Sequence, residues 1–172
     1  MRTTKRYTNT SFTKRVDHPT AASNQRPAKE PSICKSCGAI YANRRWSLEA
    51  PAKKGKAQKW EPSQYTVCPA CVQKNVGVPG GFLFVDGAFW QAHRQEIELL
   101  LQNEAARAAE TNPLAQIINW QAEGETKLTL TTTTEHLAQR LGHALEKAFD
   151  GEVRYDFSHE NKLARVWWHR DS

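Results

Sequence analysis

Four cysteines carry the clearest chemical signal in this 172-residue sequence. They form two pairs with CxxC spacing, Cys34 with Cys37 and Cys68 with Cys71, and the pairs are 30 residues apart. A CxxC turn directs two thiolates at one ion, and four thiolates satisfy the tetrahedral preference of Zn²⁺. Four protein ligands close the metal shell and leave no position for a reactive water. We therefore expect one structural zinc ion and no catalytic metal.

Two other interpretations of the cysteines remain. One is a thioredoxin-like redox pair, and the other is an iron–sulfur cluster held by the same four ligands. Redox motifs usually occur as a single CxxC at a helix N-terminus beside a βαβ pattern, and we see neither feature in the sequence. An iron absorption band would distinguish iron from colourless zinc.

Charge divides the chain into two unlike halves. Residues 1–80 hold 15 Lys+Arg and four acids, a net charge of +11, whereas residues 81–172 hold nine Lys+Arg and 14 acids, a net charge of −5. The boundary falls near Pro79-Gly80-Gly81. We predict a disordered basic arm over 1–32, a zinc ribbon over 33–80 and an α+β domain over 81–172. The arm either docks on a polyanion or only aids solubility.

Apolar periodicity in the acidic half predicts alternating helices and β-hairpins. A capping box, Thr132 followed by Glu135, opens the second helix, and Asp150-Gly151 ends it. The expected elements are a helix over 88–109, a hairpin of 114–122 and 127–131, a helix over 132–149, and a hairpin of 153–157 and 163–169. The fold class is therefore α+β, with an α-ββ-α-ββ domain following a small β ribbon.

Basic and aromatic residues are interleaved between the cysteine pairs. Cations that meet phosphates, next to rings that can stack on unpaired bases, are typical of RNA-binding surfaces. We expect RNA contacts from the following residues, of which the lysines lie in a projecting loop: Arg44, Arg45, Trp46, Lys53, Lys54, Lys56, Lys59 and Trp60. Alternatively, the rings form the small core of the ribbon and the lysines belong to a solvated loop.

The last expected strand places three functional side chains on one face. If Ala164, Val166 and Trp168 face the core, Arg165, Trp167 and His169 share the opposite face. A tryptophan between two basic groups can stack a base, as RNA-binding sheets do. Alternatively, the helix over 88–110 or the ribbon covers that face.

Several motifs together resemble a known family. They are Cys34 to Tyr41, Arg45-Trp46, Cys68 to Cys71, Pro79-Gly80-Gly81, Gly87 to Phe89, His93 to Ile97, Asn112 to Leu114 and Thr132 to Ala138. Over roughly residues 30–170 the chain resembles small, uncharacterised proteobacterial zinc-ribbon proteins. The ribbon is similar to the N-terminal part of the adaptor for export of the large ribosomal subunit, nonsense-mediated decay protein three.

This resemblance implies zinc at the four cysteines and ribosomal RNA or a ribosomal particle as partner. The sequence departs from it at Arg44, where we expect glycine before Arg45-Trp46. The adaptor also has more cysteine pairs and large extra domains.

We expect a non-enzymatic, cytoplasmic protein that binds RNA and associates with the ribosome. The sequence contains no stretch of ~18 apolar residues, so we expect no segment that spans a membrane. No secretory signal, phosphate-binding glycine loop or acid–base pair is evident. The rival interpretation is a protein–protein adaptor or stress-related factor whose zinc site is only a scaffold. A protein partner would then bind through the acidic half.

Overall fold

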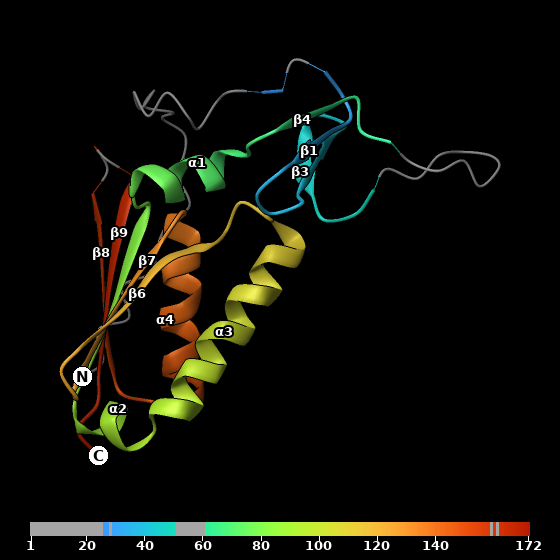
Figure 1. Cartoon of the computed structure of the whole chain (residues 1–172). Coiled ribbons are helices and arrows are strands. Elements are labelled where there is room, and N and C mark those ends of the chain that lie inside the picture. Colours follow the sequence, from blue (N-terminus) through green and yellow to red (C-terminus); the bar gives the residue numbers. More distant parts are fainter. Residues whose placement is uncertain (1–25, 28, 51–60, 159, 161) are drawn as a thin grey trace.

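The computed structural model describes residues 26–27, 29–50, 61–158, 160 and 162–172 (Figure 1). Most of the predicted arm and the loop with the four lysines lie outside these residues. Helices and two separate β-sheets make up the described part, which confirms the predicted α+β class. None of the described helices is both long enough and apolar enough to cross a membrane.

The ribbon is a four-stranded sheet with the order β3-β2-β1-β4. Its strands have three residues each: β1 (Ser32–Cys34), β2 (Ile40–Ala42), β3 (Arg45–Ser47) and β4 (Gln64–Thr66). β1 and β2 pair antiparallel, as do β2 and β3, whereas β4 runs parallel to β1. Strands this short provide few ladder hydrogen bonds and little apolar area, so the sheet depends on the cysteine cluster beside it.

The second cysteine pair opens a helix, α1 (Pro69–Val76). Cys68 is the N-cap, and its sulfur accepts a hydrogen bond from the backbone N–H of Cys71. Pro69 occupies the first helical position, where its missing N–H has no cost. Gly77 ends the helix at a φ of 68°. Our expectation that neither CxxC lies at a helix N-terminus was therefore wrong for this pair.

The larger sheet has five strands in the order β6-β7-β5-β9-β8. They are β5 (Gly81–Asp86), β6 (Ile117–Glu123), β7 (Lys127–Thr132), β8 (Glu152–Ser158) and β9 (Leu163–His169). β6–β7 and β8–β9 are the two expected hairpins, and β5 pairs antiparallel with β7 and parallel with β9. The sequence analysis missed β5, the central strand, because its Phe82-Leu83-Phe84-Val85 run shows no polar alternation.

Three helices accompany this sheet: α2 (Ala88–Ala92), α3 (Arg94–Thr111) and α4 (Glu135–Phe149). α4 lies on the sheet and α3 packs on α4 (Figure 1). The single helix expected over 88–109 is broken at His93, whose φ of −117° is not helical. The N-cap of α4 is Thr134 rather than the expected Thr132, which stays in β7 and pairs with Gly81.

One face of the large sheet is buried against the helices. Leu83, Val85, Val166 and Trp168 are at most 1% exposed, and α4 contributes Leu141 and Leu145 to the same core. Ala164, Val166 and Trp168 thus face the core as predicted. No helix or ribbon strand among the described residues lies over the opposite face, because α3 packs on α4 instead (Figure 1).

Helix α1 joins the two sheets. It lies across one end of the large sheet (Figure 1). The side-chain amide of Gln73 donates to the carbonyl of Thr133 at 3.0 Å, and Leu114 packs against the cysteine cluster. The ribbon is therefore anchored to the α+β part by a helix that also carries two of the four cysteines.

Candidate metal centre

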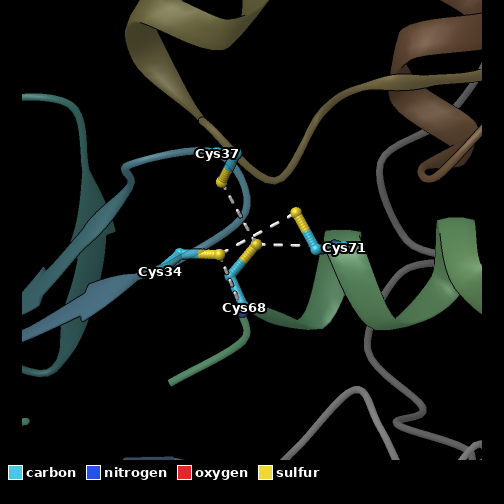
Figure 2. Close-up of side chains that lie close together, drawn as sticks. All are labelled: Cys34, Cys37, Cys68 and Cys71. Carbon is cyan, nitrogen blue, oxygen red and sulfur yellow. Dashed lines mark hydrogen bonds between the residues drawn. The ribbon is translucent and has the colours of Figure 1, made fainter. Parts of the chain in front are cut away.

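The four predicted cysteines converge on one point (Figure 2). All four sulfur atoms lie within 4.8 Å of one another. The Cys34 and Cys71 sulfurs are 3.8 Å apart, and those of Cys37 and Cys68 are 3.6 Å apart. A tetrahedral ion with metal–sulfur bonds of about 2.3 Å requires sulfur–sulfur distances of about 3.8 Å. The four side chains are therefore placed to hold one metal ion.

The first cysteine pair is shaped by a backbone turn. Cys34 ends β1, its N–H donates to the carbonyl of Ala39 at 2.7 Å, and the N–H of Gly38 donates to the carbonyl of Cys34 at 2.8 Å. Gly38 has a φ of 76°, in the left-handed region that glycine adopts without steric cost. The turn carries Cys37, whose side chain is the exposed member of the cluster.

The second pair is positioned by the start of α1. The N–H of Cys68 donates to the Cys34 sulfur at 3.2 Å, and the N–H of Cys71 donates to the Cys68 sulfur at 3.4 Å. Amide donors to sulfur stabilise a thiolate, as does the positive end of a helix. The N–H of Lys35 also donates to the carbonyl of Thr66 at 2.9 Å, which holds the two knuckles together.

Burial and hydrogen bonding shift the pKa values of the cysteine thiols in opposite directions. Burial raises the pKa of Cys34, but N–H donors from Cys68, Cys37 and Ser36 outweigh it and lower that pKa to about 6. Burial raises the pKa of Cys71 to about 11 and that of Cys68 further. The raised pKa values of Cys68 and Cys71 disfavour their thiolate forms, and a bound cation would favour them.

The predicted RNA contacts divide into described and undescribed residues. Arg44 and Arg45 lie at the turn between β2 and β3, and both are exposed. Trp46 is partly buried, because it packs on the cysteine cluster and on Tyr41, with ring centroids 5.3 Å apart. Its ring therefore also serves the small ribbon core. Lys53, Lys54, Lys56, Lys59 and Trp60 lie outside the described residues.

Arg44 occupies an unusual backbone position. Ala42 pairs with Arg45, so Asn43 and Arg44 form a two-residue turn, with φ values of 53° and 62°. Two positive φ values define a type I′ turn, which favours Asn-Gly. The expected glycine position is thus a real left-handed one, and arginine occupies it.

The cations of the ribbon have no acidic partners in the described part of the chain. The ion pairs found there all join residues between 86 and 171. Lys35, Arg44 and Arg45 take part in none of them. Within the described residues, no carboxylate therefore neutralises these three charges.

Among the described residues, the cysteine cluster is the one group of three or more potential ligand side chains close enough to share an ion. His136 and His143 on α4 lie next to carboxylates, with His136 3.8 Å from Glu135 and His143 3.5 Å from Glu146. Comparisons with protein-family models, with curated proteins and with solved structures found no match.

Strand β5 was not predicted, and with it the partly exposed rings of Phe82 and Phe84 were missed. The apolar run after Pro79-Gly80-Gly81 was the available signal for this strand. Tyr65 on β4, one of the aromatic residues interleaved with the cations between the cysteine pairs, is 71% exposed. It is more accessible than Trp46, which was chosen as a stacking residue.

Proposed function

We propose that this protein is a non-enzymatic zinc-ribbon protein that binds RNA, and that its partner is a ribosomal particle. The observation that carries the proposal is the cysteine cluster, in which sulfurs from different CxxC pairs lie 3.8 Å and 3.6 Å apart. It supports a closed, structural metal site beside cations that have no partner within the described part of the chain.

Zinc is favoured over the two alternatives. A redox pair would join sulfurs within one CxxC, whereas the short contacts here run between the pairs and are far longer than a disulfide of about 2.05 Å. An iron–sulfur cluster inserts its own irons and sulfides between the ligands and needs wider spacing. Metal analysis of purified protein should give one zinc per chain, and an iron absorption band would contradict this assignment.

RNA is favoured as partner by the charge and position of the β2–β3 turn. Arg44 and Arg45 project from a hairpin that the metal holds rigid, and the preceding strand contains no acid to compete for them. Counterion release from phosphates then supplies affinity, which must fall steeply with salt. The closed sulfur shell also supports the proposal that the metal does no chemistry.

Co-sedimentation of the full chain with ribosomal fractions, at low and high salt and with or without RNase, tests this function. We expect salt-sensitive, RNase-sensitive association. The variant R44A/R45A should weaken binding to purified ribosomal RNA and reduce the salt slope by about 0.7 per lost phosphate contact.

Arg94→Ala with Arg107→Ala is the matched control, because it removes the same charge from exposed positions on α3 that are already ion-paired. It should leave RNA binding unchanged. If both double variants lost the same amount of RNA affinity, the loss would follow from the lower net charge alone. That result would contradict the assignment of RNA binding to the ribbon. An RNase-resistant complex that ignores Arg44 and Arg45 would instead favour the protein–protein adaptor.

A further inference from the structure

The uncovered face of the large sheet carries three aromatic rings in a row. Phe82 and Phe84 lie on β5, with ring centroids 5.8 Å apart and planes 8° apart. Trp167 on β9 pairs in register with Phe84, with centroids 5.5 Å apart and planes 19° apart. All three side chains are partly exposed, and β5 and β9 are adjacent central strands. The rings therefore form one continuous aromatic surface in the middle of the sheet.

Cations and neutral hydrogen-bonding groups border these rings. On one side, the Arg154 guanidinium lies 4.2 Å from the centroid of the Trp167 ring, and Arg165 is next to Phe82 in register. On the other side, strand register places Thr129 beside Phe84 and Thr131 beside Phe82. Asp156 pairs with Arg165 at 3.6 Å. We call Phe82, Phe84, Trp167, Arg154 and Arg165 the aromatic patch.

Apart from Asp156, the acids of this face lie at one end. Asp86, Glu123 and Glu152 occupy the last register level, which is the end of the sheet away from α1. There a shallow hollow of about 360 Å³ is walled by Phe84 and Trp167 and bordered by Asp86, Lys127 and Thr129. Aromatic walls can stack a base, while carboxylate, ammonium and hydroxyl groups can hydrogen-bond to its edge.

Rings with a cation and neutral hydrogen-bonding groups beside them fit nucleobases. The Arg154 guanidinium lies against Trp167, and Thr129 and Thr131 lie beside Phe84 and Phe82 on the other side. Rings next to arginines, on an open sheet, can stack unpaired bases while the guanidinium groups meet phosphates. The three acids at the end away from α1 disfavour phosphates there, and Asp156 already pairs with Arg165, so a strand would cross the rings with its backbone near the Arg154 guanidinium.

We propose that the aromatic patch is a second RNA contact, which stacks unpaired bases of single-stranded RNA. The proposal rests on the RNA binding proposed above and adds the kind of RNA bound. The ribbon contacts phosphates of any RNA, whereas the patch requires bases that are free of pairing. The two contacts therefore differ in salt dependence and in their tolerance of duplex RNA.

Titration of fluorescently labelled RNA into the full-length, zinc-loaded protein tests the patch. The probes are a short mixed-sequence single strand and the duplex it forms with its complement. Trp167→Ala and Phe84→Ala should each weaken binding of the single strand by about tenfold, with an unchanged salt slope and unchanged duplex binding. Trp167→Phe should retain most of the affinity, because it keeps a ring.

Leu99→Ala is the control, since Leu99 is a 59% exposed apolar residue on α3. It should bind like the wild type, and thermal unfolding should show that all variants are folded. Wild-type affinity in both Trp167→Ala and Phe84→Ala would overturn the patch, as would equal losses on single strand and duplex, or a Trp167-dependent protein complex that resists RNase.

The two proposals fail separately. If the wild type binds RNA and R44A/R45A lowers the salt slope, but the patch variants change nothing, the patch alone is wrong. If the wild type binds neither RNA probe at low salt, the proposed function itself is wrong, and the patch falls with it.

Discussion

The ribbon and the α+β part are held together by different means. The cluster inside the ribbon consists of three buried cysteines with Ala39 and Ala70, whereas the α+β core contains Trp90, Trp168 and seven fully buried leucines. A short segment cannot bury enough apolar area to offset its ordering entropy, and a metal held by the four cysteines can take the place of the missing core. We therefore expect the stability of the ribbon to depend on a bound ion and that of the α+β part to be independent of it.

The two parts also use their cations differently. In the α+β part, Arg94, Arg107, Arg140 and Arg165 all pair with carboxylates. In the described residues of the ribbon, no cation does. These four arginines of the α+β part thus make internal contacts, whereas Lys35, Arg44 and Arg45 of the ribbon form no ion pair with another described residue.

Metal removal should give the largest difference between the parts. Chelation, or Cys68→Ser, should unfold the ribbon and leave the α+β part folded, because structural zinc supplies on the order of 10 kcal/mol of folding free energy. Two-dimensional NMR of the full chain should lose the dispersed ribbon signals and keep those of the sheet. Loss of both sets of signals would show that the parts fold as one unit.

A core truncation should do the reverse. Trp168 is fully buried and its indole N–H donates to the carbonyl of Asp150 at 2.7 Å. Trp168→Ala should lower the free energy of unfolding of the α+β part by about 3–5 kcal/mol, because it leaves a cavity. Denaturant unfolding measures this change, and zinc affinity should stay the same. A weakened zinc affinity would indicate coupling through α1.

The ion pairs between α3 and α4 should contribute less and depend on pH. Burial raises the pKa of Glu104, but Arg140 and Arg107, at 3.1 and 2.7 Å, outweigh it and lower that pKa. Because the pKa of Glu104 is lower in the folded protein than the unfolded-state value of about 4.3, the ionised carboxylate stabilises the fold at pH values above about 4.3. This stabilisation is lost as the pH falls through the folded-state pKa.

Glu104→Gln should therefore cost about 1 kcal/mol at neutral pH and very little below the folded-state pKa. Denaturant unfolding of both proteins as a function of pH measures the difference. A constant difference at every pH would assign the loss to packing instead of charge.

The smallest effect should come from the strained turn of the ribbon. Arg44→Gly removes a side chain from a φ of 62° and should stabilise the turn by about 0.5–1 kcal/mol. Zinc binding and folding of the ribbon are coupled, so a more stable turn should raise the zinc affinity. The variant should bind zinc a fewfold more tightly than the wild type, which competition with a chelator measures. RNA binding should weaken at the same time. Unchanged zinc affinity would show that the turn carries no strain.

Local patterns in the sequence were sufficient for much of this fold. The four cysteines, both hairpins and the helix over 135–149 all depend on spacings within a few residues, and the structure contains each of them. Other features were not predictable in this way. Whether Thr132 or Thr134 caps α4 depends on the pairing of Thr132 with Gly81, far away in sequence.

What the sequence by itself determined is the ligand set and the division of charge, because CxxC spacing and residue counts need no long-range contacts. Only the tertiary structure decided that β5 is the central strand, that α1 starts at the second cysteine pair, and that α3 packs on α4. Because of that packing, no described helix covers the partly exposed Phe82, Phe84 and Trp167. Which face of a sheet stays open depends on where distant helices pack, and residue alternation along a strand is the same in either case.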